Sequence, residues 1–294
     1  MTAVDADVDA RIRALPCWRV VSSVEPLPGG MTNHNYRVRD AQGGFVVRLG
    51  EDIALHGVSR AHELAAARAA HAIGISPQVV FAGPGVMVSR YVDGRTLQPH
   101  ELGDAKRLPQ VVDLIRRCHR DMPPVLRPPS PHFRVFDVIR RYGAVLQAVP
   151  AQLLGTRLGG LLQLARTLEV ALGPGDTVFG HNDLLAGNFL DDGTRLWLID
   201  WDYAGFNTLL FDLANLSANN AFSGLQAREM LTMYFGTAPD AARLRDLHAM
   251  QAVSMVREVL WGAVSHHHAR LEFDFAGYTQ TWLDRLAAHG TGDG

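Results

Sequence analysis

Residues 181–188 read HNDLLAGN, and residues 198–202 read LIDWD. Transfer of a phosphoryl group to an alcohol requires an acceptor for the hydroxyl proton and oxygen ligands for Mg2+. Asp183 stands where the proton acceptor belongs, Asn188 offers an amide oxygen to the metal, and Asp200 offers a carboxylate at the end of an apolar strand. Asp and Asn are also frequent in polar turns. The combination at this spacing nevertheless favours a phosphotransferase site over a turn.

The segments around these motifs predict a helix-rich lobe over residues 94–294. Apolar residues at helical spacing indicate helices near Asp104 to Asp121, Phe133 to Val149, Thr156 to Leu172, and within Phe211 to Ala288. The segment Thr177 to Asp202 interrupts this pattern, because there a loop leads into the short apolar run Leu196 to Ile199. We therefore expect the catalytic loop and the acceptor site in this lobe.

The first 93 residues predict a smaller lobe built on an antiparallel sheet. Strands are expected at Val20 to Leu27, Asn35 to Val38, Phe45 to Leu49, Val79 to Ala82 and Val86 to Val92, with a helix at Ser59 to Ile73. The turn signal Asp93-Gly94 ends this lobe. The expected fold class is therefore α+β, with a sheet-based N-terminal lobe over residues 1–93 and a helical C-terminal lobe.

The longer strings HNDLLAGNFL, LWLIDWDYAG and FDLANLSANN resemble the choline and ethanolamine kinase branch of the aminoglycoside phosphotransferase and choline kinase superfamily, including its bacterial members. The resemblance covers about residues 25 to 285. It implies a two-lobe, protein-kinase-like fold with ATP and Mg2+ as cofactors in the cleft. It also implies catalytic roles for Asp183, Asn188 and Asp200, the last two as metal ligands. His181 would have a structural role and would fix the catalytic loop by hydrogen bonds.

A glycine-containing loop lies between the first two predicted strands, where a kinase covers the nucleotide phosphates. Gly30 would let backbone N–H groups approach a phosphate closely, and Thr32 and Asn33 follow it in the same loop. The sequence Pro-Gly-Gly is also an ordinary hairpin turn. The resemblance favours a nucleotide-binding role for the three residues.

Arg48 occupies the position on the third strand where protein kinases carry a phosphate-binding lysine, and Glu63 on the following helix is placed to pair with it. Arginine agrees with the choline kinase resemblance, and its guanidinium can bind two phosphate oxygens at once. Ser89 to Tyr91 look like the hinge whose backbone would hold adenine. Arg48 and Glu63 could also be charged surface residues, and the segment Ser89 to Tyr91 could be an ordinary strand end.

The acceptor site is predicted around Trp261 and Tyr278, because choline kinases have a similar stretch. A quaternary ammonium cannot donate a hydrogen bond, so its site relies on aromatic faces and a nearby acid. Trp and Tyr at helical positions are also ordinary core residues. Asn219 stands where eukaryotic relatives have an acid and Val264 where they have a second tryptophan; Asp202 could supply the missing charge.

Choline is the expected acceptor, and ethanolamine, thiamine and aminoglycosides are the alternatives within the superfamily. A rival of another class is a pseudokinase, a nucleotide-binding interaction module without turnover. The intact Asp183, Asn188 and Asp200 argue against it. A metal-dependent hydrolase that uses Asp200 and Asp202 is a weaker rival.

Composition excludes other partner classes. The 294 residues contain 47% hydrophobic and 20% charged residues, as globular enzymes do, and the net charge of -2 gives no basic surface for nucleic acid or membrane. We therefore expect a small-molecule acceptor and a monomer or homodimer. The chain begins with acidic residues and contains no run of about 18 apolar residues, which predicts a cytoplasmic protein.

Overall fold

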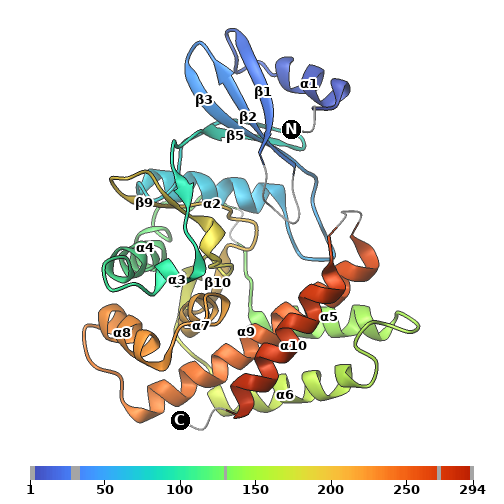
Figure 1. Ribbon diagram of the computed structural model, residues 1–294, viewed down its shortest axis with the longest axis vertical. Coiled ribbons are helices and arrows are strands. Elements are labelled where there is room, and N and C mark those ends of the chain that lie inside the picture. Colours follow the sequence, from blue (N-terminus) through green and yellow to red (C-terminus); the bar gives the residue numbers. More distant parts are fainter. Residues whose placement is uncertain (1–3, 28–33, 129–130, 270–272, 292–294) are drawn as a thin grey trace.

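The N-terminal part of the chain forms an antiparallel sheet in the order β1-β2-β3-β5-β4 (Figure 1). The computed structural model describes residues 4–27, 34–128, 131–269 and 273–291. The strands are β1 (Val21–Leu27), β2 (His34–Asp40), β3 (Gly43–Leu49), β4 (Val79–Gly83) and β5 (Val86–Arg90). The predicted strands are thereby confirmed. The glycine-containing loop with Gly30, Thr32 and Asn33 lies outside the described residues.

A helix that the sequence analysis did not predict, α1 (Ala6–Arg13), precedes the sheet. The side chain of Asp5 caps it by accepting hydrogen bonds from the backbone N–H groups of Asp7 and Val8. Acids in its first turn and arginines in its last turn complement the helix dipole. Its Ile12 joins the small core of the sheet, which contains Val38, Phe45, Val47, Leu49 and Val88.

Helix α2 (Arg60–Ala72) connects the sheet to the rest of the molecule. Its buried alanines, Ala66, Ala67, Ala69 and Ala70, belong to the large core of the C-terminal part. Figure 1 shows the helix between the sheet and the helical part. Small side chains allow this close packing, and the first turn of α2 carries the charged residues Arg60 and Glu63.

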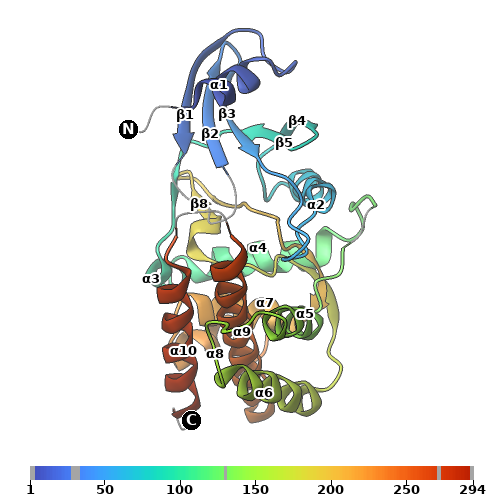
Figure 2. The ribbon, with the colours of Figure 1, turned by 90° about the vertical axis from the view of Figure 1, so that its right-hand side faces the viewer.

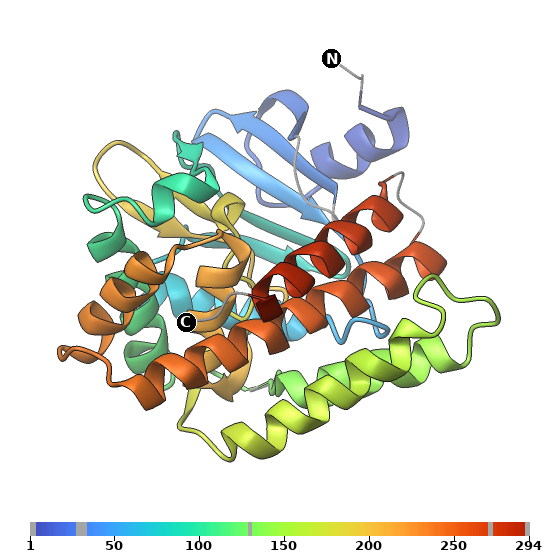
Figure 3. The same cartoon turned by 60° about the horizontal axis from the view of Figure 1, so that its bottom comes forward.

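The C-terminal part is mostly helical and contains α3 (Pro99–Leu102), α4 (Leu108–Asp121), α5 (Val135–Gln147), α6 (Arg157–Leu172), α7 (Leu209–Asn219), α8 (Gly224–Phe235), α9 (Ala241–His268) and α10 (Phe275–Thr291). Helix α9 is buried from Ala252 to Ser265 and contacts α5, α6, α7 and α10. Figures 2 and 3 show α10 lying along it. The helix predicted from Asp104 begins only at Leu108, because Pro109 favours the first turn of a helix.

Short strands place the catalytic motifs among these helices. Strand β7 (Thr177–Gly180) pairs with β10 (Gly205–Thr208), and β6 (Arg95–Thr96), β8 (Phe189–Asp191) and β9 (Leu196–Leu198) form a second small sheet. The loop 181–188 therefore starts at the end of β7, and Asp200 follows the end of β9. Among the described residues, no helix is both long and apolar enough to cross a bilayer.

Candidate active site

Asn182 and Asp212 anchor the predicted catalytic loop, residues 181–188, through buried hydrogen bonds. Asn182 has a left-handed backbone (φ 63°), and its side-chain amide donates to the carbonyl oxygens of Gly180, Tyr203 and Gly205 at 3.1–3.2 Å. The carboxylate of Asp212 on α7 accepts the backbone N–H groups of His181 and Asn182 at 2.8 and 2.7 Å. The loop conformation is thus fixed by buried hydrogen bonds, which are costly to break.

The Asp212 carboxylate is itself stabilised as an anion. Burial alone would raise its pKa, but a hydrogen bond from His119 at 2.9 Å and the backbone donors of the loop lower the pKa of Asp212 below its usual value. A charged acceptor makes stronger hydrogen bonds than a neutral one. Asp212 therefore serves as the anchor of the loop.

His181 faces away from solvent and joins the two motifs. Its Nε2 lies 3.0 Å from the carbonyl oxygen of Ile199, and its ring packs against Trp201 with centroids 4.8 Å apart. Burial lowers the pKa of His181, which keeps the imidazole neutral and lets Nε2–H donate to that carbonyl. This is the contact expected of a residue that fixes the loop.

Asp183, Asn188 and Asp200 come together at the open side of the loop. The Asp183 side chain is 16% exposed, and burial raises the pKa of its carboxyl while Arg257 lowers it. Asn188 donates its amide N–H to the backbone carbonyl of Asp183 at 2.8 Å, which leaves its Oδ1 available. Asp200 has a left-handed backbone (φ 67°), and its side chain is 32% exposed. Strained backbone of this kind is concentrated at functional sites.

The oxygens of Asn188 and Asp200 suit Mg2+ in chemical type. Mg2+ usually binds one or two protein carboxylates and completes its shell with water and phosphate oxygens. The described residues include no group of three or more His, Cys, Asp or Glu side chains arranged to hold a metal. Asn188 and Asp200 would thus hold a Mg2+ ion together with water or phosphate oxygens.

Arg48 and Glu63 form the ion pair that the sequence predicts, and the pair belongs to a larger network. The guanidinium of Arg48 also hydrogen-bonds to Asp202 and lies 3.2 Å from the carboxylate of Asp200. Arg60 at the start of α2 contacts Glu63 at 2.7 Å and Asp202 at 2.8 Å. Two arginines of the N-terminal part thus hold two aspartates of the C-terminal part.

The predicted hinge lies at the end of β5. Ser89 pairs with Val46 and Val79 in the sheet, and the N–H of Tyr91 donates to the carbonyl of Gly44 at 3.0 Å. An adenine contact at Tyr91 would therefore use its carbonyl. A cavity of about 470 Å3 borders Arg90 to Asp93, the end of α2 with the segment that follows it, and the turn between β8 and β9. Its described lining contains none of Arg48, Asp183, Asn188 and Asp200, so it is not the expected site of the nucleotide phosphates.

Trp261 and Tyr278 lie side by side, with ring centroids 5.4 Å apart. The indole N–H of Trp261 donates to the hydroxyl of Tyr203 at 2.8 Å, and the hydroxyl of Tyr278 donates to Glu258 at 2.8 Å. Trp261 is only 4% exposed. The pair is thus an aromatic wall with polar groups satisfied inside the protein.

Asn219 and Asp202, the other residues predicted for the acceptor, lie elsewhere relative to this wall. Asn215 of α7 hydrogen-bonds to Ser254 of α9, and Ser217 to Gln251, so the two helices run in opposite directions. Asn219, at the end of α7, therefore lies toward the N-terminal half of α9. Its neighbour Asn220 donates to the carbonyl oxygen of Leu184 at 2.9 Å. The Asp202 carboxylate is bonded to the two arginines of the network described above.

The sequence analysis missed Arg257 and Glu258 on α9. They are 1% and 2% exposed, and Arg257 lies 3.6 Å from the Asp183 carboxylate. The sequence contains a signal for them, because they are the only charged residues other than histidine between Leu247 and His268. Charged residues in an apolar helix are almost never fully buried without a partner.

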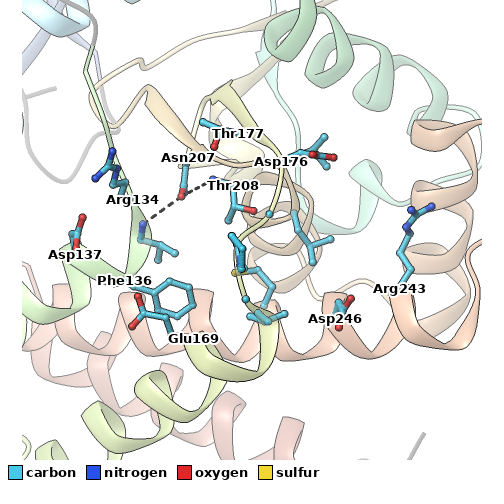
Figure 4. A pocket seen from close by; sticks show the side chains of 18 of the residues that line it. Arg134, Phe136, Asp137, Glu169, Asp176, Thr177, Asn207, Thr208, Arg243 and Asp246 are labelled. Carbon is cyan, nitrogen blue, oxygen red and sulfur yellow. Dashed lines mark hydrogen bonds between the residues drawn. The ribbon is translucent and has the colours of Figure 1, made fainter.

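A cavity of about 630 Å3 is lined by residues of β10, the start of α5 and the N-terminal part of α9 (Figure 4). Its wall includes Asn207, which donates to the side chain of Asn182 at 3.0 Å. Its described lining contains no residue predicted for the site and mixes acids such as Asp176 and Asp246 with Arg243. We assign no ligand to it.

Comparison with known proteins places the chain in a family. Residues 23–247 match the model of the phosphotransferase enzyme family. Protein LicA of Haemophilus influenzae is 31% identical over 215 residues, which cover 70% of this chain and 61%, less than two thirds, of LicA. Probable choline kinase 1 of Arabidopsis thaliana is 25% identical, over 88% of this chain and 86% of the relative.

The fold has a similar solved counterpart. A choline/ethanolamine kinase family protein from Mesorhizobium loti superposes with a TM-score of 0.81 and 29% identity, over 97% of this chain and 94% of that protein. This likeness confirms the predicted fold class, with a sheet-based N-terminal lobe and a helical C-terminal lobe. The chain therefore belongs to the phosphotransferase enzyme family, as the motifs around Asp183 and Asp200 predicted.

Proposed function

We propose that the protein is an ATP- and Mg2+-dependent kinase that phosphorylates the hydroxyl of a small amino alcohol, with choline as the best acceptor. The observation that carries the proposal is the placement of Asp183 and Asn188 in the loop 181–188 near Asp200, which contacts Arg48 of the ion-pair network. These residues supply a proton acceptor, metal-binding oxygens and a phosphate-binding cation, which together meet the requirements of phosphoryl transfer.

Each side chain would have one task. The Asp183 carboxylate would accept the proton of the acceptor hydroxyl, and its raised pKa suits it to hold that proton. Asn188 and Asp200 would hold Mg2+, which neutralises charge on the phosphates. Arg48 would bind the phosphates and be oriented by Glu63. The resting contact between Arg48 and Asp200 supports this assignment, because it brings the cation to the metal-binding carboxylate.

The aromatic wall favours an acceptor that carries an ammonium group. The rings of Trp261 and Tyr278 can attract a cation through their quadrupoles, a contact that contributes about 0.5 to 2 kcal/mol. The names of relatives agree with this acceptor class, since they include a probable choline kinase and a choline/ethanolamine kinase family protein. Choline carries both a hydroxyl group and a quaternary ammonium group in one small molecule.

A coupled ADP-release assay with a panel of acceptors tests the proposal. The panel holds choline, ethanolamine, thiamine and an aminoglycoside, each with ATP and Mg2+, and the controls are no acceptor and Asp183→Ala. We expect choline to have the highest kcat/KM. A higher kcat/KM for thiamine or an aminoglycoside would refute the acceptor but not the kinase. ADP release that no acceptor increases would favour a hydrolase, and nucleotide binding without any turnover would favour a pseudokinase.

A further inference from the structure

Arg257 is a fully buried cation close to the proposed base. It is 1% exposed, and it lies within the part of α9 that runs through the centre of the C-terminal lobe. Its Nη1 donates to Glu258 at 2.5 Å and lies 3.6 Å from Oδ1 of Asp183. One guanidinium nitrogen is therefore shared between a structural acid and the catalytic loop.

The surroundings of Arg257 fix its position. Its guanidinium carbon lies 4.6 Å from the ring centroid of Tyr203 and 5.7 Å from that of Phe133, both within the range of cation–π contact. Glu258, which is 2% exposed, accepts the Tyr278 hydroxyl on its second oxygen. The side chain of Arg257 thus has aromatic rings and an acid around it, and little freedom to turn.

These contacts form a continuous chain from the acceptor wall to the base. Tyr278 donates to Glu258, Glu258 accepts from Arg257, and Arg257 faces the carboxylate of Asp183. A base must be held within a fraction of an ångström of the hydroxyl that it serves. Asn188 bonds to the Asp183 backbone carbonyl, so Arg257 is the cation that acts on the side chain itself.

We propose that Arg257 is a positioning residue that holds the Asp183 carboxylate toward the acceptor hydroxyl, and that Glu258 and Tyr278 hold Arg257 in place. The inference rests on the proposed function, because it needs Asp183 as the base. It extends that function by joining the acceptor wall to the base through one network of side chains.

A purely structural role makes a different prediction. Removing one member of a buried ion pair usually lowers stability, because the other member stays buried without its partner. If Arg257 only paired with Glu258, Arg257→Met should therefore lower the thermal midpoint but leave the kcat of the folded enzyme unchanged. A positioning role instead requires the positive charge, so lysine should restore what methionine loses.

The test compares Arg257→Met, Arg257→Lys and Glu258→Gln in the full chain, with choline, ATP and Mg2+. We expect Arg257→Met to lower kcat about a hundredfold and to leave the dissociation constant of ATP within about twofold. The kcat of Arg257→Lys should be at least about tenfold higher than that of Arg257→Met. Glu258→Gln, which keeps an acceptor for Tyr278 but loses the charge, should fall between wild type and Arg257→Met.

A matched control is Arg107→Met. Arg107 pairs with the buried Asp191 at 2.5 Å in the same lobe, yet neither residue belongs to the predicted site. This variant should keep kcat within about twofold of wild type. Retained ATP binding by each variant shows that it has folded, so a loss of kcat reports on the site.

Three outcomes would overturn the inference. The first is a kcat of Arg257→Met within about threefold of wild type. The second is an Arg257→Lys variant no better than Arg257→Met. The third is a lower KM for choline with unchanged kcat in Arg257→Met, which would mean that Arg257 repels the acceptor cation. Failure of wild type with every acceptor would instead refute the proposed function.

Discussion

Replacing Glu63 with glutamine should impair the use of ATP, because Glu63 orients Arg48. Glutamine has the same shape and keeps one acceptor oxygen, but it removes the charge that faces Arg48 and Arg60. The Glu63 side chain is only 2% exposed, so solvent cannot replace the lost partner. The ion pair with Asp202 remains, and it should keep Arg48 folded into the site.

The expected size follows from these contacts. A hydrogen bond to a charged group contributes about 1.5 to 3 kcal/mol. Losing one such bond to Arg48 should lower kcat/KM for ATP by about 10- to 150-fold. Arg48→Met should cost about tenfold more, since it removes the phosphate-binding cation as well. If Glu63 acts through Arg48, kcat/KM for ATP of the double variant should lie within about threefold of that of Arg48→Met. This result corresponds to a coupling energy of about 1.5 to 3 kcal/mol between the two residues.

The assay is a double-mutant cycle on kcat/KM for ATP at saturating acceptor, with the thermal midpoint of each variant as a check on folding. Glu101→Gln is the control, because Glu101 pairs with Arg95 on the surface, where Arg95 is 57% exposed. Surface pairs contribute about 0 to 1 kcal/mol, so this control should leave ATP use unchanged. Additive losses in the Arg48 and Glu63 cycle would refute the coupling. Arg48 would then be oriented by Asp202 and Asp200 without Glu63.

Three further changes test the rest of the site, and a fourth tests the buried His56, whose Nδ1 lies 3.0 Å from the Tyr142 hydroxyl. Asp183→Ala should lower kcat by more than tenfold, over about 1.4 kcal/mol, with ATP affinity retained in a binding titration; a smaller loss would exclude it as the base. Asp200→Asn should raise the Mg2+ concentration for half-maximal rate about tenfold or more, and an unchanged Mg2+ titration would exclude it as a ligand. Trp261→Ala should raise KM for choline about tenfold, but not for a neutral isostere such as 3,3-dimethylbutanol; an equal rise for both would refute the cation contact. Burial lowers the pKa of His56 to about 3, so as the pH falls below about 6.5 the unfolded chain binds a proton at this residue while the folded chain does not. Between pH 7 and 5, the free energy of unfolding of wild type, measured with denaturant, should fall by about 2 kcal/mol more than that of His56→Gln. Equal falls for the two proteins would contradict this prediction.

Much of the fold could be predicted because its signals are local. The strand around Val38 alternates apolar and polar residues, the strand around Val47 is a short and mostly apolar run, and the helix after Ser59 is rich in alanine and ends near a glycine. Helix α1 was missed although Asp5 is a good N-cap, since the segment is short and mostly polar. Its only fully buried residue is Ile12, so hydrophobic periodicity gives almost no signal there.

The candidate site likewise contains residues that local sequence predicts and contacts that it does not predict. Asp183, Asn188 and Asp200 lie in two neighbouring segments, and their spacing alone indicates their chemistry. Arg60 lies 142 residues from Asp202 and bonds to it only because two lobes meet. No periodicity within a segment reports such a pair. For the same reason the sequence does not reveal that α7 runs opposite to α9, which places Asn219 toward the N-terminal half of α9.

The charges around the phosphate-binding side of the site suggest why a divalent cation would be needed. Among the described residues, Arg48 and Arg60 face the carboxylates of Glu63, Asp200 and Asp202, and these five side chains have a net charge of -1 when all are ionised. A triphosphate is a polyanion, and like charges in a partly buried site repel strongly. The arginines are already bonded to the acids and cannot by themselves attract it. We therefore expect nucleotide affinity to depend steeply on Mg2+, which would neutralise Asp200 and the phosphates together and leave Arg48 free to turn toward them.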